Sequence, residues 1–341
     1  MRAISILLLW AGMTLAQGDP LVQGIQAFDE GRYSAAERHL EQALQIRDDP
    51  KARLFLALTQ AATGRCPSAE PQLLDAFEKS PDDSLQRLAG LGVARCRIAA
   101  KRFAAAILVL DQLRQQYPAD ADVLYEAARA HLKAWNDVIF EMFEKSPASF
   151  RVNQLSAEIF EIQGQHAEAV REYNKALEKS PHTLNLHYRL GRALLMQSHS
   201  PEAQEAARRE FEAELELNPN DAVAEYQVAQ ILQAQQQHAE AVARLEKAVA
   251  LDPQFSEALV ALGRARAGDQ RYEEAIQLLE RAVELTPRNE GAHYALMVTY
   301  RNAGRPQDAL RLKKRLEQLQ QAPEGEFSDF LKRIGEPSPQ P

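Results

Sequence analysis

The side chains best suited to chemistry are few and widely spaced in this chain. Its eight histidines include no pair four residues apart, so no helix would present two imidazoles to one zinc ion. The sequence also lacks the glycine-rich phosphate and dinucleotide loops, the GxSxG nucleophile turn and the EF-hand calcium loop. We therefore predict no catalytic residues, no metal site and no cofactor, and we expect a protein that is not an enzyme.

Short acidic or amide pairs stand between the predicted helices and could be mistaken for metal ligands. Asp82 with Asp83, and Asn220 with Asp221, are two examples. Each pair precedes a helix, where a side-chain oxygen accepts hydrogen bonds from backbone N–H groups that have no partner within the helix. We interpret these pairs as helix caps.

Composition favours packed helices over sheets. The chain has 341 residues, of which 45% are hydrophobic and only 7% are aromatic. Alanine is abundant and β-branched and aromatic residues are not dominant, which favours an all-α fold. The net charge of −8 argues against binding to nucleic acid.

Residues 1–16 have the features of a secretory signal peptide. Arg2 precedes an apolar stretch over residues 4–10, and the small residues Thr14 and Ala16 frame a cleavage point after Ala16. The alternative is an N-terminal segment that is retained and anchors the chain to a membrane. No later stretch approaches the roughly 18 apolar residues of a transmembrane helix. We expect an exported protein, periplasmic or secreted, with no transmembrane helix once the signal is removed.

A period of 34 residues organises most of the chain. Ala207, Ala241, Ala275 and Ala309 follow one another at this interval, and each lies within a matching pattern of two amphipathic helices joined by a turn. Repeats of this length bury their apolar faces against neighbouring repeats, so they form an elongated array.

One repeat shows the pattern most clearly. Residues 256–289 place small residues at Gly263, Ala275 and Ala282, where two helices must approach closely, and Pro287 ends the second helix. This pattern resembles the tetratricopeptide repeat family. The resemblance implies an all-α fold, a right-handed α-solenoid superhelix of about nine helix-turn-helix repeats.

The repeat frame divides the chain as follows. We expect a solenoid over residues 17–323, a capping helix over 324–335 and a disordered tail over 336–341. The repeats fall at about 17–50, 50–83, 87–120, 121–149, 150–183, 184–221, 222–255, 256–289 and 290–323. Because each repeat depends on its neighbours for burial, we expect one continuous array and no separable domains.

Two repeats depart from this frame. The fourth is short and carries Trp135 where a small residue is expected, so its turn near residues 134–137 is either shortened or absorbed into one helix. The sixth has four extra residues around 197–202, which we interpret as a longer turn that projects from one rim.

The two cysteines occupy comparable places in adjacent repeats. Cys66 begins the second helix of one repeat, and Cys96 lies late in the first helix of the next, so both fall toward the same end. A disulfide between Cys66 and Cys96 and two separate half-buried thiols remain as alternatives.

The resemblance further implies that the first helices line a concave groove. The inward positions carry tyrosines and basic residues: Tyr125, Arg129, Lys133, Arg151, Tyr188, Arg192, Tyr226, Arg264, Tyr294 and Arg301. Tyrosine and arginine often concentrate binding energy, which predicts a groove for protein or extended peptide segments, with acidic segments favoured by charge. In the alternative interpretation, these residues only stack helix on helix.

We therefore expect an exported, non-enzymatic scaffold or adaptor that holds partner proteins in its groove, in envelope assembly or secretion. The alternative function is a non-catalytic subunit that delivers protein substrates to an enzyme complex. The sequence names neither the partner nor the oligomeric state.

Overall fold

A computed structural model describes residues 18–320, and every regular element in that range is an α-helix. The first seven helices are α1 (Pro20–Asp29), α2 (Tyr33–Ile46), α3 (Pro50–Ala62), α4 (Cys66–Lys79), α5 (Asp83–Ala99), α6 (Phe103–Gln116) and α7 (Ala121–Lys145). The next ten are α8 (Phe150–Ile162), α9 (His166–Lys179), α10 (Leu186–Gln197), α11 (Pro201–Leu217), α12 (Ala222–Ala234), α13 (His238–Leu251), α14 (Ser256–Gly268), α15 (Tyr272–Leu285), α16 (Glu290–Asn302) and α17 (Pro306–Gln320). The expected all-α class is confirmed.

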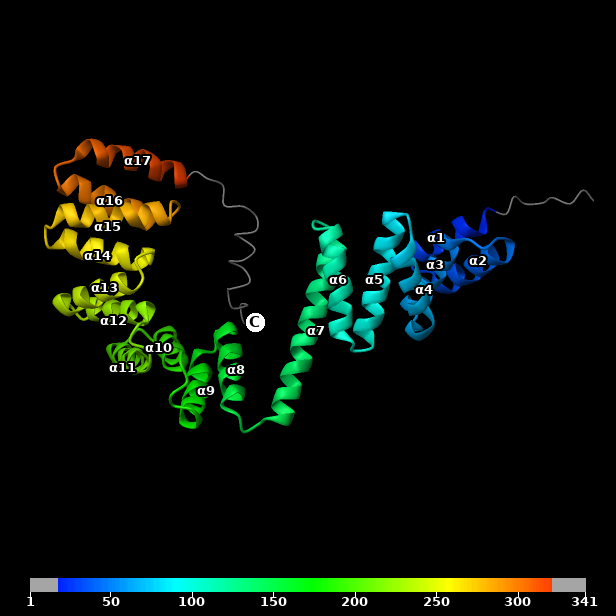
Figure 1. Cartoon of the computed structure of the whole chain (residues 1–341), viewed down its shortest axis with the longest axis horizontal. Coiled ribbons are helices and arrows are strands. Elements are labelled where there is room, and N and C mark those ends of the chain that lie inside the picture. Colours follow the sequence, from blue (N-terminus) through cyan, green and yellow to red (C-terminus); the bar gives the residue numbers. More distant parts are fainter. Residues whose placement is uncertain (1–17, 321–341) are drawn as a thin grey trace, which may run out of the picture. The chain divides into compact units, whose positions relative to one another are not determined.

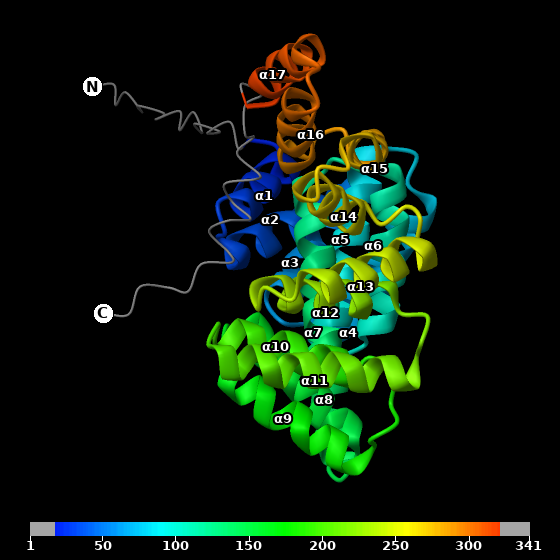
Figure 2. The same ribbon diagram turned by 90° about the vertical axis from the view of Figure 1, so that its left-hand side faces the viewer.

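The helices form two compact units that meet in sequence at Lys145 and Ser146. We call residues 18–145 the N-terminal unit and residues 146–320 the C-terminal unit. Within each unit, the helices follow one another in chain order and pack mainly against their neighbours in sequence, which is the arrangement of a solenoid (Figure 1, Figure 2). Two units differ from the single continuous array that the sequence predicts.

The division falls at the irregular fourth repeat. Residues 121–145 form the single helix α7, so the turn near residues 134–137 is absorbed into one helix, the second of the two alternatives. Eight helix pairs and this single helix therefore account for the nine predicted repeats. Because the fourth repeat lacks a second helix of its own, α7 packs against α5 and α6, and the packed array of the N-terminal unit ends there.

The turns within the pairs share one backbone conformation. Seven of the eight pairs are joined by three residues whose middle residue has a positive φ, for example 72° at Gly31 and 60° at Gln270. The exception joins α10 to α11. There the predicted longer turn is wrong, because residues 198–200 form a turn of ordinary length and the extra residues lengthen α11 to 17 residues.

Small residues allow the paired helices to approach closely. A Cβ atom on Gly263 of α14 would lie 2.7 Å from the Leu279 Cγ atom of α15, and one on Gly24 would lie equally close to Leu40 Cγ. The second helices carry a fully buried alanine at the same position in seven repeats: Ala36, Ala69, Ala106, Ala169, Ala207, Ala241 and Ala275. The small residues recur every 34 residues because each repeat brings its two helices into close contact at the same positions.

The acidic residues before the first helices are caps, as predicted. An Asp82 carboxylate oxygen accepts hydrogen bonds from the Ser84 and Leu85 N–H groups at 2.8 and 3.1 Å. Asp221 does the same for the N–H groups of the first turn of α12. These caps fix where α5 and α12 begin.

Three predictions concern the ends of the chain. The predicted signal peptide (1–16), the capping helix (324–335) and the tail (336–341) lie outside the described residues. Between residues 18 and 320, no helix is both long enough and apolar enough to cross a membrane.

Candidate functional site

The ten residues predicted to face a groove all lie on first helices, or on α7, and none of them is buried. They fall into separate groups. Tyr125, Arg129 and Lys133 lie in the N-terminal unit, and the other seven lie in the C-terminal unit. Within the C-terminal unit, the structure gathers five of these seven into two hollows.

The first hollow lies between α8 and α10 and has a volume of about 700 Å³. It brings together three predicted residues, Arg151, Tyr188 and Arg192. The remaining lining residues are Gln154, Thr183, Leu184, Asn185 and Arg189. Three arginines and no carboxylate line this space, in a chain whose net charge is −8. We call it the basic hollow.

The three arginines of the basic hollow differ in how their charge is balanced. Arg189 Nη1 lies 3.5 Å from Glu158 Oε1 and 3.8 Å from Glu161 Oε2, at the edge of ion-pair distance. Arg151 donates a hydrogen bond to Gln154 Oε1 at 2.7 Å, which leaves its charge unneutralised. Arg192 is exposed and forms no ion pair with any carboxylate of the described residues. The hollow therefore carries positive charge that an anionic group could neutralise.

Tyr188 is held in place at the wall of the basic hollow. Its ring centroid lies 5.6 Å from that of Phe211 on α11, and the half-buried ring packs into the core. Burial raises the pKa of the Tyr188 phenol, and the positive charge of Arg192 opposes that rise. Tyr188 thus both stacks helix on helix and faces the hollow, so the two interpretations of the sequence are compatible at this residue.

A buried carboxylate fixes the start of α10 and, with it, the position of Tyr188. Glu214 of α11 is fully buried, and its carboxylate accepts hydrogen bonds from the N–H groups of Asn185 at 2.8 Å and Tyr188 at 3.4 Å. Asn185 itself has a left-handed backbone and makes no side-chain cap. Sequence reasoning missed this cap, although a glutamate between the buried residues Phe211 and Leu215 was a signal for it.

The second hollow lies between α12 and α14, reaches the start of α16, and has a volume of about 250 Å³. Tyr226 and Arg264, both predicted, line it. Its other lining residues are Gln230, Gln233, Glu257, Val260, Ala261, Asn289 and Gly291. The Arg264 guanidinium donates a hydrogen bond to the Gly291 carbonyl at 3.2 Å. Burial raises the pKa of Tyr226, so this phenol stays neutral and offers a hydroxyl group to a ligand.

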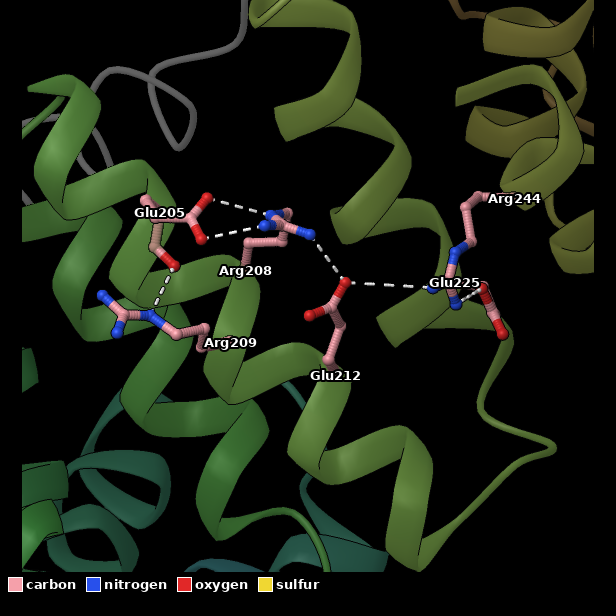
Figure 3. Close-up of polar contacts among 6 residues, drawn as sticks. All are labelled: Glu205, Arg208, Arg209, Glu212, Glu225 and Arg244. Atoms are coloured by element: carbon pink, nitrogen blue, oxygen red, sulfur yellow. Dashed lines mark hydrogen bonds and ion pairs between the residues drawn. The ribbon is translucent and has the colours of Figure 1, made fainter. Parts of the chain in front are cut away.

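A chain of ion pairs supports the helix that carries Tyr226 (Figure 3). Arg208 on α11 contacts Glu212 at 2.9 Å, and Arg244 on α13 links Glu212, at 3.9 Å, to Glu225 on α12, at 2.9 Å. Glu225 is fully buried and is the residue before Tyr226. These contacts tie the sixth repeat to the seventh and position α12.

The other predicted residues are not brought into either hollow. Arg129 forms an ion pair with Glu126 at 2.9 Å, and its guanidinium lies 5.6 Å from the Tyr125 ring centroid. Lys133 is exposed on α7, and Tyr294 and Arg301 are exposed on α16. Their role in binding stays a prediction.

The cysteines lie where the repeat frame places them. Cys66 is the first residue of α4, and Cys96 is in the last turn of α5. Their Sγ atoms are 2.14 Å apart and form a disulfide, with the Cα atoms separated by 5.2 Å. The bond joins the second and third repeats.

Family models match most of the chain. Tetratricopeptide repeat models match residues 27–91 and 266–326, 226–290, and 88–120, and a TPR repeat model matches 157–198. The stretch 121–156, which contains α7, and the stretch 199–225, which contains α11, have no match. No curated protein matches the sequence significantly.

Several solved structures are similar to part of this chain. MamA 41-end from Desulfovibrio magneticus RS-1 has a TM-score of 0.46 and 23% identity, over 52% of this chain and 97% of that one. YrrB, described as a TPR protein with an unusual peptide-binding site, has a TM-score of 0.45 and 20% identity, over 57% of this chain and 97% of its own. The TPR2AB domain of yeast Sti1 in complex with pHSP90 has a TM-score of 0.38 and 17% identity, over 75% and 96% respectively.

Proposed function

The chain belongs to the tetratricopeptide repeat family, and on that premise we propose that it is a non-enzymatic scaffold that holds partner proteins on the face formed by its first helices. The basic hollow is the observation that carries this proposal. It joins residues of two consecutive first helices, offers several hydrogen-bond donors and presents arginine charge without a lining carboxylate. A surface of this kind suits an extended segment of another protein.

The charge of the hollow favours an acidic ligand. Arg151 and Arg192 can each donate two parallel hydrogen bonds to a carboxylate, and Tyr188 and Leu184 add an apolar wall beside them. Because the hollow is open along the first helices, a side chain carried by an extended peptide reaches it without a deep cavity. We infer that glutamate or aspartate side chains of the partner bind there.

Export is part of the proposal. The leader over residues 1–16 supports a periplasmic or secreted location, and the Cys66–Cys96 bond supports an oxidising compartment, where such bonds persist. In that location the scaffold would serve envelope assembly or secretion. The alternatives are retention of the leader as an N-terminal anchor, and service as the subunit that delivers protein substrates to an enzyme complex.

The proposal is tested with fluorescein-labelled unstructured peptides. One peptide carries glutamates at regular intervals, and its control has glutamine at the same positions. Fluorescence anisotropy should show tighter binding of the acidic peptide, and the double change Tyr188→Ala with Arg192→Glu should weaken it about tenfold or more.

A matched control separates the hollow from net charge. Arg209→Glu makes the same charge change at an exposed arginine of α11, outside the hollow, and should leave binding within about twofold. Equal binding of the two peptides, or equal loss in both variants, would contradict the basic hollow as the site. Affinity capture from the exported fraction with the same variants then tests the scaffold role, and a co-captured enzyme would favour substrate delivery.

A further inference from the structure

Exposed apolar side chains are concentrated on α7. Seven of the 17 large hydrophobic residues that are exposed among the described residues lie on this one helix: Leu124, Tyr125, Leu132, Trp135, Val138, Phe140 and Phe143. Each other helix has at most one. Scattered single residues are ordinary on a protein surface, but a concentration on one helix indicates an interface.

Three of these exposed residues belong to a regular seam along α7. Tyr125, Ala128, Leu132, Trp135, Ile139 and Met142 follow one another at alternating intervals of three and four residues, which is the heptad spacing of a coiled coil. The buried residues of α7, at 123, 126, 127 and 130, occupy the positions opposite this seam. Within the N-terminal unit, α7 therefore packs against α5 and α6 on the side opposite the seam. Four seam residues are exposed, and Ile139 and Met142 are half-buried.

The seam is complementary to itself when two copies of α7 run antiparallel. In one register, Leu132 lies opposite Trp135 of the second copy, Ala128 opposite Ile139, and Tyr125 opposite Met142. Two-fold symmetry repeats each of these three layers, and each layer joins a larger side chain to a smaller or more flexible one. A second α7 supplies a helix with the same heptad spacing.

The residues that flank the seam do not oppose this pairing. Between residues 124 and 143, the flanking positions are Leu124, Arg129, His131, Asn136, Val138 and Phe143. Arg129 is the only permanent charge among them, and it forms an ion pair at 2.9 Å with Glu126 of the same helix, which also pairs with Arg95. Two copies therefore bring no like charges together at this surface.

We propose that the protein forms a homodimer through antiparallel packing of the α7 seams of two copies. This goes beyond the binding of a partner segment at the basic hollow, because it uses a different unit of the chain. It also accounts for the unbroken fourth repeat, since a turn at residues 134–137 would interrupt the seam. Tyr125, which the sequence assigns to the groove, then packs within the dimer.

The test measures the mass of the full chain in solution by sedimentation and light scattering, over about 1 to 100 µM, a range in which interfaces of modest size associate. Wild type should have twice the mass of one chain. The double change Leu132→Glu with Ile139→Glu should give a monomer with the same helix content by circular dichroism. Phe140→Glu is the matched control, because Phe140 is 74% exposed on the same helix but lies off the seam, and this variant should stay dimeric.

Cross-linking tests the register. Ala128→Cys with Ile139→Cys should form a covalent dimer under mild oxidation, while Ala128→Cys alone should not. The two introduced thiols of one chain cannot meet, because eleven residues of helix separate them by about 16 Å. A monomeric wild type over the whole range, or a dimer that survives the seam variant, would overturn the proposal. A wild-type monomer that dimerises only after removal of residues 324–341 would assign the seam to the chain's own C-terminal segment and would also overturn it.

Discussion

His187 Nδ1 lies 2.7 Å from a carboxylate oxygen of Glu210, so an ionisable pair joins α10 to α11 beside the basic hollow. The other ring nitrogen, Nε2, lies 3.2 Å from the Pro181 carbonyl oxygen. Only a protonated imidazole donates hydrogen bonds from both nitrogens, so both contacts favour the charged ring. The hydrogen bond with Glu210 is the main cause that raises the pKa of His187 above its ordinary value, against the opposite effect of burial.

This pair should make stability depend on pH. Because the pKa of His187 is higher in the folded state, its stabilising effect is complete below pH of about 6.5 and is lost as pH rises through the raised value. We expect His187→Gln to lower the free energy of unfolding by roughly 1 kcal/mol at about pH 5.5 and by less at about pH 8.5. Urea unfolding at several pH values measures the change. His182→Gln, at an exposed position nearby, is the control, and a pH-independent loss in His187→Gln would argue against the pair.

The disulfide should stabilise the N-terminal unit. Cys66 and Cys96 are 30 residues apart, and a loop of that length restricts the unfolded chain enough to contribute about 3.6 kcal/mol. Reduction, or Cys66→Ser with Cys96→Ser, should lower the denaturant midpoint of the N-terminal unit. Reductant should not affect the double variant further. Nonreducing mass spectrometry of the secreted protein provides the direct check, and two free thiols there would contradict the bond.

The repeat frame could be read from the sequence because its cause is local. Two helices that cross at Gly263 and Ala275 cannot tolerate larger side chains, so the spacing of small residues records the geometry directly. The start of α11 was also readable, since Ser200 and Pro201 form a capping residue followed by proline in the first turn. These two residues place the extra residues of the sixth repeat in α11 and not in the turn.

The sequence could not predict in the same way whether the fourth repeat forms two helices or one. Lys101 and Gln270 adopt the positive φ of a turn without being glycine, so the absence of glycine at residues 134–137 does not decide between turn and helix. The packing of α7 against α5 and α6 contributes to the choice between turn and helix. For the site, the four-residue spacing of Tyr188 and Arg192 placed them on one helical face, whereas Arg189 enters the hollow from beside them and Glu214 acts from a different helix.

Gly263 should not accept even a methyl group without cost. Its added Cβ would lie 2.7 Å from Leu279 Cγ, so Gly263→Ala forces the two helices apart and should lower the free energy of unfolding by about 1 to 3 kcal/mol. Gly268→Ala, in the same helix, is the matched control because nothing lies within 4 Å of its added Cβ. That variant should be neutral or more stable by about 0.5 kcal/mol. Equal effects in thermal and urea unfolding would refute the close contact.

Glu225 should contribute more to stability than the exposed end of the same network. Its carboxylate is fully buried and pairs with Arg244 at 2.9 Å and Lys247 at 2.5 Å. Glu225→Gln keeps the shape but removes the charge that both cations contact. We expect a loss of about 2 kcal/mol, measured by urea unfolding.

The matched control for Glu225 lies at the other end of the network. Glu205 contacts Arg208 at 2.8 Å, but its side chain is 39% exposed, so water replaces the lost contact in Glu205→Gln and the loss should stay below about 0.5 kcal/mol. Salt gives a second test. Added salt screens the exposed pair more than the buried one, so the cost of Glu225→Gln should change little when ionic strength rises about tenfold. Because Glu225 precedes Tyr226, Glu225→Gln should also disturb the second hollow. The basic hollow does not contain Tyr226, so acidic-peptide binding there should change less than the structure of the second hollow.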